Sequence, residues 1–549
     1  YALPIIPPLV VFPFLETREG QMKKVLVADK VAPECMEILE KAGLDIEFKP
    51  GLSEEELMEA IRGVHGVICR SGARLNAGVL EAADNLEAIC RAGVGVDNID
   101  VDTASKKGIV VMNTPGGNTI STAEHAFALM LALARNIGPA YVSMREGRWD
   151  KKKFIGSQLA GSTLGIVGLG RIGRSVTKRA LAFGMTVLAY DPYLSHETAA
   201  KTGAELVDNM EDLLSRVDYL TVHVPENSQT DGLIGAAEIA LMKNDARVIN
   251  CARGSIVDQQ AVLDAIEAGL LGGAAFDVYV HEPPDDYQFA ASDRVLATPH
   301  LGASTEEAQI AVATQAAEQM VDALQRQYFR NALNVSPVPP EDMKVLEPYC
   351  ELAASLGLLV AQLNRGRPES IEVSCRGDIA QRNIDPIVTY GAVGVLRHML
   401  GSTVNMVSAS YVAEERGIHV TSSSTMGQDA GFTDLVEVKL VSDVGAIQAA
   451  GTIFGRKYPR IVRIGDYYVE VIPAGHILVT YAEDVPGLIG SVGSILAEGC
   501  VNIARMGFGR EEAGGSAILA LNLDSAPDEE TIQRIRDVDV VREVMLVRL

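Results

Sequence analysis

The sequence predicts an α/β protein with two doubly wound parallel sheets and a cleft between them, followed by two α+β units. Short apolar runs alternate with helix-length segments from residue 24 onward, which is typical of strand–helix–strand units. A glycine-rich turn at 166–173, IVGLGRIG, separates a buried run from an amphipathic one. Residues 476–549 follow the order strand, helix, strand, strand, helix, strand, which predicts a ferredoxin-like module.

The first sheet is expected from residues 22–118. Its strands are predicted at 25–28, 66–69, 86–90 and 109–112. A long helix then begins near Ser121, where Ser121 and Glu124 form a capping box. We expect this helix to connect the first unit to the second.

The second sheet is expected within residues 119–304. Its strands are predicted at 163–167, 186–190, 219–224, 247–251 and 273–278. A second capping box, Ser304 with Glu307, opens a helix over about 305–327. We expect residues 305–335 to return to the first unit, and the resulting cleft between the two units is a place where small ligands bind.

Three glycines in the turn at 166–173 predict a dinucleotide site. Gly168, Gly170 and Gly173 provide a tight turn, a close backbone approach and close helix packing, and these are what a pyrophosphate at a helix N-terminus requires. An ordinary glycine-rich turn is the alternative, but Asp191 stands at the end of the following strand. Its carboxylate accepts hydrogen bonds from ribose hydroxyls and repels a 2′-phosphate, so the sequence favours NAD over NADP.

Composition excludes some classes of partner. A net charge of −24 argues against nucleic acid, because phosphate backbones repel such a surface. Hydrophobic residues make up 48% and charged residues 22%, as in globular proteins, and no membrane partner is expected. Seven scattered cysteines without a CxxC pair fit a reducing compartment, so we expect a cytoplasmic protein with no metal site.

Residues 1–21 differ from the rest of the chain. The stretch 3–15 is apolar, but it contains four prolines and is too short to span a bilayer. No basic segment precedes it, which argues against a signal peptide. We expect folding to begin near Met22 and the leader to be unstructured and dispensable.

Three charged side chains in separate segments are the candidate catalytic groups. Arg253 can hold a carboxylate, His300 can transfer a hydroxyl proton, and Glu282 can orient the imidazole. Taken singly, each also has an ordinary interpretation: a surface ion pair for Arg253, a turn acid for Glu282 and a loop histidine for His300. The residues alone leave both interpretations open.

The spacing of these residues closely resembles that of the D-isomer-specific 2-hydroxyacid dehydrogenases. The segments RAGVGVDN (91–98), NTPGGNT (113–119), IVGLGRIG and HLGAST carry the resemblance, which covers residues 22–549. It implies that Arg253, Glu282 and His300 are the catalytic set. It also implies NAD contacts from Gly168, Gly170, Arg171, Ile172, Gly173, Asp191, Cys251, Ala252, Arg253, Asp277, His300, Leu301, Gly302 and Ala303.

The same resemblance places substrate contacts in the first unit, at Arg70, Ser71, Arg91 and Asn118. One departure is Val94, where family members often carry threonine. The chain is most similar to the long members of the family, which oxidise 3-phospho-D-glycerate to 3-phosphohydroxypyruvate at the start of L-serine synthesis. A hydroxypyruvate or glyoxylate reductase is the alternative enzyme, and an NAD-sensing scaffold is the alternative outside enzymes.

The C-terminal part favours the enzyme that oxidises 3-phospho-D-glycerate, because simpler family members usually end near the proline-rich linker at 337–340. Residues 342–472 resemble an allosteric substrate-binding domain, and 476–549 resemble an ACT regulatory domain. In the latter, Asp484 and Asn502 stand at effector-binding positions, so L-serine is the expected effector. Ala482 replaces the usual aromatic residue there. The family also implies a homodimer or homotetramer.

Overall fold

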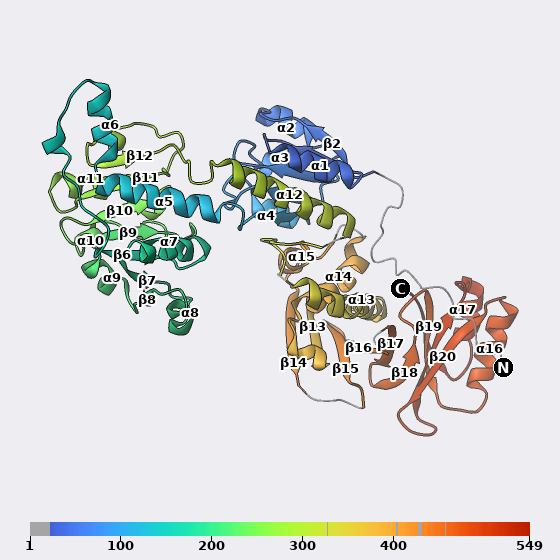
Figure 1. Ribbon diagram of the computed structural model, residues 1–549. Coiled ribbons are helices and arrows are strands. Elements are labelled where there is room, and N and C mark those ends of the chain that lie inside the picture. The colour runs from blue at the N-terminus through green and yellow to red at the C-terminus, as the bar shows by residue number, and fades with distance from the viewer. Residues whose placement is uncertain (1–21, 327, 337, 402–403, 427–430, 456) are drawn as a thin grey trace, which may run out of the picture.

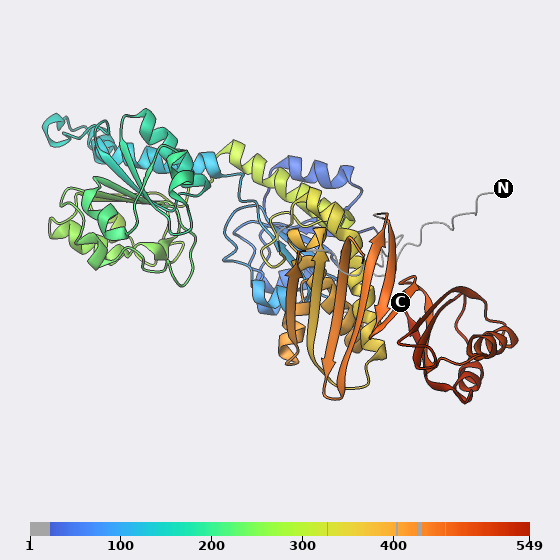
Figure 2. The ribbon, with the colours of Figure 1, turned by 90° about the horizontal axis from the view of Figure 1, so that it is seen from below.

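The computed structural model describes residues 22–549 apart from 327, 337, 402–403, 427–430 and 456. The predicted leader, residues 1–21, lies outside the described residues. Four units built on four sheets are arranged along the molecule (Figures 1 and 2). The unit that carries the glycine-rich turn lies at one end and the C-terminal unit at the other, with the first and third units between them.

The first unit is a five-stranded parallel sheet in the order β2-β1-β3-β4-β5. Its strands are β1 Lys24–Val27, β2 Asp45–Phe48, β3 Gly66–Cys69, β4 Ala88–Arg91 and β5 Val110–Met112. Its helices are α1 Pro33–Lys41, α2 Glu54–Ala60, α3 Ala77–Ala82 and α4 Val101–Lys106. The long helix α12, Glu306–Arg326, returns to this unit and buries Val312, Ala316 and Met320 in one of its cores.

The second unit is a seven-stranded parallel sheet in the order β12-β11-β10-β9-β6-β7-β8, which is the order of a Rossmann fold with one added strand. Its strands are β6 Thr163–Val167, β7 Thr186–Tyr190, β8 Glu205–Leu206, β9 Tyr219–Val222, β10 Arg247–Asn250, β11 Gly273–Phe276 and β12 Val295–Ala297. Its α-helices are α5 Thr119–Ala134, α6 Ile137–Arg145, α7 Arg171–Ala182, α8 His196–Ala200, α9 Met210–Arg216, α10 Ala236–Ile239 and α11 Gln259–Glu267.

Both predicted capping boxes are wrong. Helix α5 begins at Thr119, so Ser121 lies inside its first turn and donates to the Asn118 carbonyl at 3.0 Å. The helix begins early because the turn at 114–117 leads directly into it. Helix α12 begins at Glu306, and Thr305, not Ser304, accepts a hydrogen bond from the Ala308 amide at 3.2 Å.

The third unit is a six-stranded sheet in the order β14-β13-β15-β16-β17-β18, in which only the β13–β14 pair is parallel among the described pairs. Its strands are β13 Pro368–Gly377, β14 His419–Thr425, β15 Asp434–Ser442, β16 Gly445–Phe454, β17 Tyr458–Ile464 and β18 Tyr467–Val471, and its helices are α13 Pro340–Leu363, α14 Asp385–Leu400 and α15 Ala409–Glu415. Of the predicted linker prolines, Pro337 lies outside the described residues, Pro339 is the N-cap of α13 and Pro340 opens the helix.

The C-terminal unit is an antiparallel sheet in the order β20-β21-β19-β22. Its elements are β19 His476–Glu483, α16 Leu488–Glu498, β20 Ile503–Arg510, β21 Ser516–Leu523, α17 Glu529–Arg536 and β22 Val541–Arg548. This is the predicted ferredoxin-like order. The α/β class and the parallel sheets are therefore confirmed.

Among the described helices, none alone has the length and apolarity of a bilayer span. Helices α5 and α6 reach that threshold only as a pair, and the pair is bent by 67°.

Candidate functional site

The glycine-rich turn connects β6 to α7, and each of its three glycines has a distinct environment. Gly168 has a φ of +91°, in the left-handed region that favours glycine. A Cβ on Gly173 would collide with the Gly168 carbonyl oxygen, whereas a Cβ on Gly170 would meet no described atom within 4 Å. The turn thus packs tightly under α7 and leaves open space at its N-terminus, which fits the pyrophosphate of NAD.

Asp191 follows β7 and lies beside this turn. Its Oδ2 accepts a hydrogen bond from the Leu169 amide at 3.0 Å, and its Oδ1 accepts one from the Tyr193 amide at 3.1 Å. The carboxylate is therefore oriented next to the turn, where the ribose of a bound dinucleotide is expected.

The other predicted NAD contacts gather at the same edge of the sheet. Arg171 and Ile172 open α7, Cys251 and Ala252 follow β10, Asp277 follows β11, and His300, Leu301, Gly302 and Ala303 follow β12. Because parallel strands end at a common edge, these residues lie at the edge of the sheet that carries the glycine-rich turn. The chain thus has residues that can hold NAD.

His300 and Glu282 form a close pair. The Nδ1 atom of His300 lies 2.6 Å from Oε2 of Glu282, and the Tyr279 amide donates to Oε1 of the same carboxylate at 3.1 Å. Burial raises the pKa of Glu282, but the hydrogen bonds from His300 and Tyr279 outweigh it and hold that pKa below the ordinary value. An ionised Glu282 fixes the proton of His300 on Nδ1 and leaves Nε2 free to accept one.

Arg253 connects the two units. Its Nε lies 3.4 Å from Oδ2 of Asp97 in the first unit, while its Nη1 donates to the Ala252 carbonyl at 2.7 Å. The positive charge of Arg253 is also among the causes that lower the pKa of Glu282. The structure therefore brings Arg253, Glu282 and His300 close together.

Arg91 of the first unit lies near Arg253 and near a second arginine of its own unit, Arg70. Burial lowers the pKa of Arg91, and the nearby positive charges of Arg253 and Arg70 add to that effect. Within the described part of the chain, Nε of Arg91 is buried without a hydrogen-bond partner. Such a group of guanidiniums, with Asp97 as the nearby carboxylate, is suited to an anion.

The loop that carries Arg70 and Ser71 is held rigidly. Oδ2 of Asp29 accepts from the amides of Arg70 at 2.6 Å and Ala73 at 3.1 Å, and the Asn98 side chain donates to the carbonyls of both residues at 2.8 and 2.6 Å. Ser71 is exposed at the tip of this loop.

Asn118 occupies the hinge between the units. It is the N-cap residue of α5, and its side-chain Oδ1 is buried with no hydrogen-bond partner among the described residues. A buried amide oxygen of this kind is available to a donor on a ligand.

The sequence analysis missed His125 and Thr298. Both contact the carboxylate of Asp277, at 3.1 Å for Nε2 of His125 and at 2.6 Å for the Thr298 hydroxyl. The one signal for His125 was its position as a histidine within the apolar sequence of α5, and Thr298 belongs to the segment before His300.

The two predicted effector residues do not lie together in one chain. Asp484 follows Glu483, which pairs with Ser516 at one end of β21, whereas Asn502 precedes Ile503, which pairs with Leu523 at the other end. At a rise of about 3.3 Å per residue, the two ends of this strand are about 23 Å apart. Asp484 is bound by Arg510 at 2.8 Å, and Asn502 donates to Asp524 at 2.7 Å.

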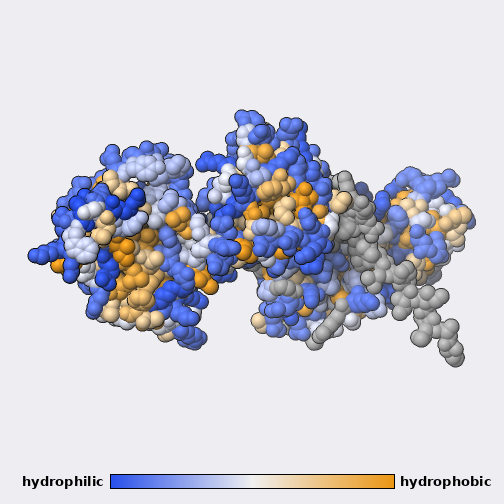
Figure 3. Space-filling view, turned by 45° about the horizontal axis from the view of Figure 1, so that its top comes forward, coloured by the Kyte–Doolittle hydropathy of each residue, from blue (hydrophilic) through white to orange (hydrophobic). Residues whose placement is uncertain are grey.

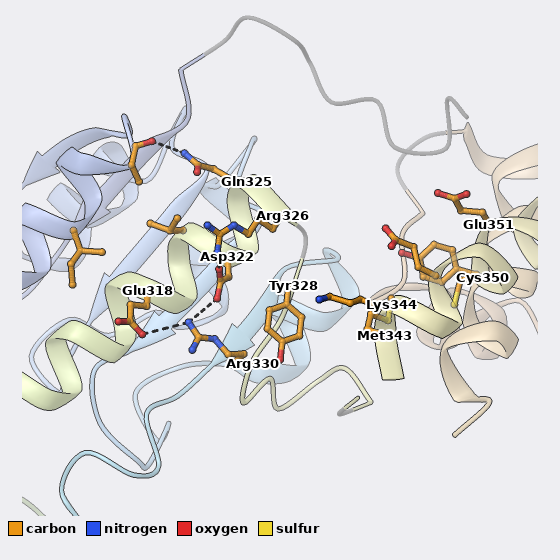
Figure 4. Close-up of a pocket in the computed structure, with 15 residues that line it drawn as sticks. Glu318, Asp322, Gln325, Arg326, Tyr328, Arg330, Met343, Lys344, Cys350 and Glu351 are labelled. Carbon is orange, nitrogen blue, oxygen red and sulfur yellow. Dashed lines mark hydrogen bonds and ion pairs between the residues drawn. The ribbon is translucent and has the colours of Figure 1, made fainter. Parts of the chain in front are cut away.

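A separate cavity of about 830 Å³ lies between the first and third units. Figure 4 shows Glu318, Asp322, Arg326 and Arg330 on the side of α12, and Met343, Lys344, Cys350 and Glu351 on the side of α13. None of the predicted site residues lines it. The candidate active site is thus at the sheet edge described above.

Family models and relatives match most of the chain. Residues 127–302 match the family described as D-isomer specific 2-hydroxyacid dehydrogenase, NAD binding domain, and residues 345–465 match the D-3-phosphoglycerate dehydrogenase intervening domain. The D-3-phosphoglycerate dehydrogenase of Methanocaldococcus jannaschii is 41% identical over 96% of this chain and 100% of its own length.

A second relative of the same name, from Bacillus subtilis, is 37% identical over 96% of this chain and its whole length. Among solved structures, NAD⁺-bound 3-phosphoglycerate dehydrogenase from Entamoeba histolytica matches with a TM-score of 0.50 and 28% identity, over 57% of this chain and 99% of that one. The chain therefore belongs to the D-3-phosphoglycerate dehydrogenase family.

Proposed function

We propose that this protein catalyses the NAD-dependent oxidation of 3-phospho-D-glycerate to 3-phosphohydroxypyruvate, the first step of L-serine biosynthesis. The observation that most supports this reaction is the His300–Glu282 pair, which lies beside Arg253 and the arginines of the first unit. The pair lies at the sheet edge that carries the glycine-rich turn. The full-length relatives that bear the name D-3-phosphoglycerate dehydrogenase support the same reaction.

In this reaction Arg253 binds the substrate carboxylate through its guanidinium. Nε2 of His300 takes the proton of the 2-hydroxyl group while Glu282, ionised and bound to Nδ1, stabilises the imidazolium that forms. Gly168, Gly170, Gly173 and Asp191 would hold NAD, which would supply the acceptor for the hydride from C2.

The 3-phosphate is bound by Arg70, Arg91 and Ser71. The unpartnered Nε of Arg91 supplies a buried donor, and the rigid loop at 70–73 supplies Arg70 and the Ser71 hydroxyl. Asn118 contributes its side chain from the hinge. A substrate with two anionic ends suits this group of cations better than glyoxylate, which has one.

A turnover assay tests the proposal. The purified protein is given NAD with 3-phosphoglycerate, and in parallel NADH with hydroxypyruvate or glyoxylate, and absorbance of NADH is followed. Faster turnover of the unphosphorylated acids would favour the alternative reductase. Binding of NAD without turnover of any of these substrates would favour a scaffold.

We further propose that the protein is a homodimer or larger, paired through the coenzyme-binding unit. The segment from α6 to residue 155 exposes Ile137, Tyr141, Val142, Met144, Trp149 and Ile155. Figure 3 shows hydrophobic residues on the surface of that unit. A second copy of the chain is the partner that would cover this segment, and analytical ultracentrifugation at micromolar concentration tests it. A cytoplasmic location and inhibition by L-serine complete the proposal.

A further inference from the structure

We infer that His125 is a positioning residue for catalysis: through Asp277 it holds the backbone of residues 300–302, and with it the imidazole of His300, in place. This inference rests on the proposed function, because it concerns how the proposed catalytic histidine is oriented. His125 itself is on α5, the helix that joins the first unit to the second.

Asp277 is the centre of the arrangement. Its side chain is 1% exposed and accepts four hydrogen bonds. Three of the donors come from the loop that carries His300: the Thr298 hydroxyl at 2.6 Å, the Leu301 amide at 2.7 Å and the Gly302 amide at 2.8 Å. The fourth is Nε2 of His125 at 3.1 Å.

The backbone of His300 requires this support. Its φ of +54° lies in the left-handed region, which costs a non-glycine residue free energy. The His300 amide donates to the Asp277 carbonyl at 2.9 Å, and the amides of the next two residues donate to the Asp277 carboxylate. The position of Asp277 therefore determines where the imidazole of His300 stands relative to Glu282.

His125 adds a donor from α5, outside the loop, to the Asp277 carboxylate. The Thr298 hydroxyl uses its proton on Asp277, so Nε2 of His125, 3.1 Å from both Thr298 Oγ1 and Asp277 Oδ1, is the donor to these two oxygens. A buried carboxylate that loses one charge-assisted donor is held less firmly.

A second contact links the same helix to the same loop. The Thr122 hydroxyl, one turn before His125, donates to the Gly302 carbonyl at 3.3 Å. Helix α5 begins at Thr119, directly after Asn118 in the hinge, so two of its side chains connect the hinge to the loop that carries His300. Any shift of α5 is thereby transmitted to His300.

The test compares His125→Leu with His125→Gln, whose amide nitrogen can still donate to Asp277. We expect kcat of His125→Leu with 3-phosphoglycerate to fall about 10- to 100-fold, because a misplaced proton acceptor slows the chemical step. KM for the substrate and the Kd of NADH, measured by its fluorescence, should stay within about threefold. The acidic limb of the kcat/KM–pH profile should also move, and His125→Gln should recover most of kcat.

His65→Leu is the matched control, because His65 is another buried histidine, accepting from the Lys24 amide at 3.1 Å outside the site. It should lower the melting temperature and leave kcat and the pH profile unchanged. Wild-type kcat and pH profile in His125→Leu would overturn the inference, as would a loss in His125→Leu that His125→Gln does not restore. An inactive wild-type enzyme would instead overturn the proposed function.

Discussion

Nε of Arg253 lies 3.4 Å from the Asp97 carboxylate, so this side chain of the coenzyme-binding unit, which we propose to be catalytic, reaches across to the first unit. Asp97 follows β4 of the first sheet and Arg253 follows β10 of the second, so this contact joins the two units. The pair places a guanidinium where both the substrate carboxylate and the reacting carbonyl are expected.

Replacing this guanidinium should affect turnover and binding together. For Arg253→Ala we expect kcat/KM with 3-phosphoglycerate to fall about 100-fold or more, with KM raised and kcat lowered, because one group anchors the carboxylate and polarises the carbonyl. Steady-state kinetics measure this, and Arg294→Ala, at an exposed arginine, is the control. Wild-type kcat/KM in Arg253→Ala would contradict the assignment.

The same substitution at two glycines three residues apart should have different effects. Gly173→Ala should destabilise the fold by ~1–3 kcal/mol, because its Cβ collides with the Gly168 carbonyl. Gly170→Ala should leave the melting temperature unchanged, since its Cβ meets no described atom within 4 Å, but should weaken NAD binding about tenfold. Thermal unfolding and titration with NADH distinguish the two, and equal effects at both positions would contradict the geometry.

Asp191→Ala should lower NAD affinity and relax discrimination against NADP. The carboxylate beside the Leu169 amide would no longer bind the ribose hydroxyls or repel a 2′-phosphate. The readout is the ratio of kcat/KM for NAD to that for NADP. If that ratio is unchanged, Asp191 does not contact the ribose.

The stability contributed by Asp277 should depend on pH. Burial raises the pKa of Asp277. Hydrogen bonds from His125, Thr298 and Leu301 lower this pKa by more than burial raises it, so the pKa lies below the ordinary 3.8. A group with a depressed pKa stabilises the fold above its unfolded pKa, and this stability is lost as the pH falls through the folded pKa. The free energy of unfolding of the wild type should thus exceed that of Asp277→Asn by about 1–3 kcal/mol at pH 7.

The difference in free energy of unfolding between the wild type and Asp277→Asn should shrink below pH 3.8. Urea unfolding of both proteins between pH 3 and 7 measures it. A difference that stays constant over this range would mean that the Asp277 charge does not contribute.

The separation of Asp484 from Asn502 predicts where L-serine binds. A single L-serine that contacts both residues must lie between the C-terminal units of two chains, because within one chain they stand at opposite ends of β21. Asp484→Ala and Asn502→Ala should each abolish inhibition by L-serine. Mixed oligomers of the two variants should regain part of the inhibition, because one of the two sites between unlike chains then has both wild-type residues. Absence of any recovery would show that the two residues do not share a ligand.

Local sequence was sufficient for the strands around the dinucleotide turn. The predicted bounds 163–167 and 186–190 are those of β6 and β7, because an apolar run between a turn and a helix has few other ways to be buried. The β-α-β-β-α-β order of the last unit was also predictable, since each element carries its own periodicity.

Helix starts and the support of the catalytic loop depended on tertiary contacts. Ser121 and Glu124 have the residue types of a capping box, but the N-cap of α5 is Asn118 in the hinge, three residues before Ser121. His125 looks like any histidine in an apolar helix, because its partner Asp277 is 152 residues away. Periodicity and spacing report which residues become buried. The hydrogen-bond partner that a buried polar group finds is decided only when distant segments pack together.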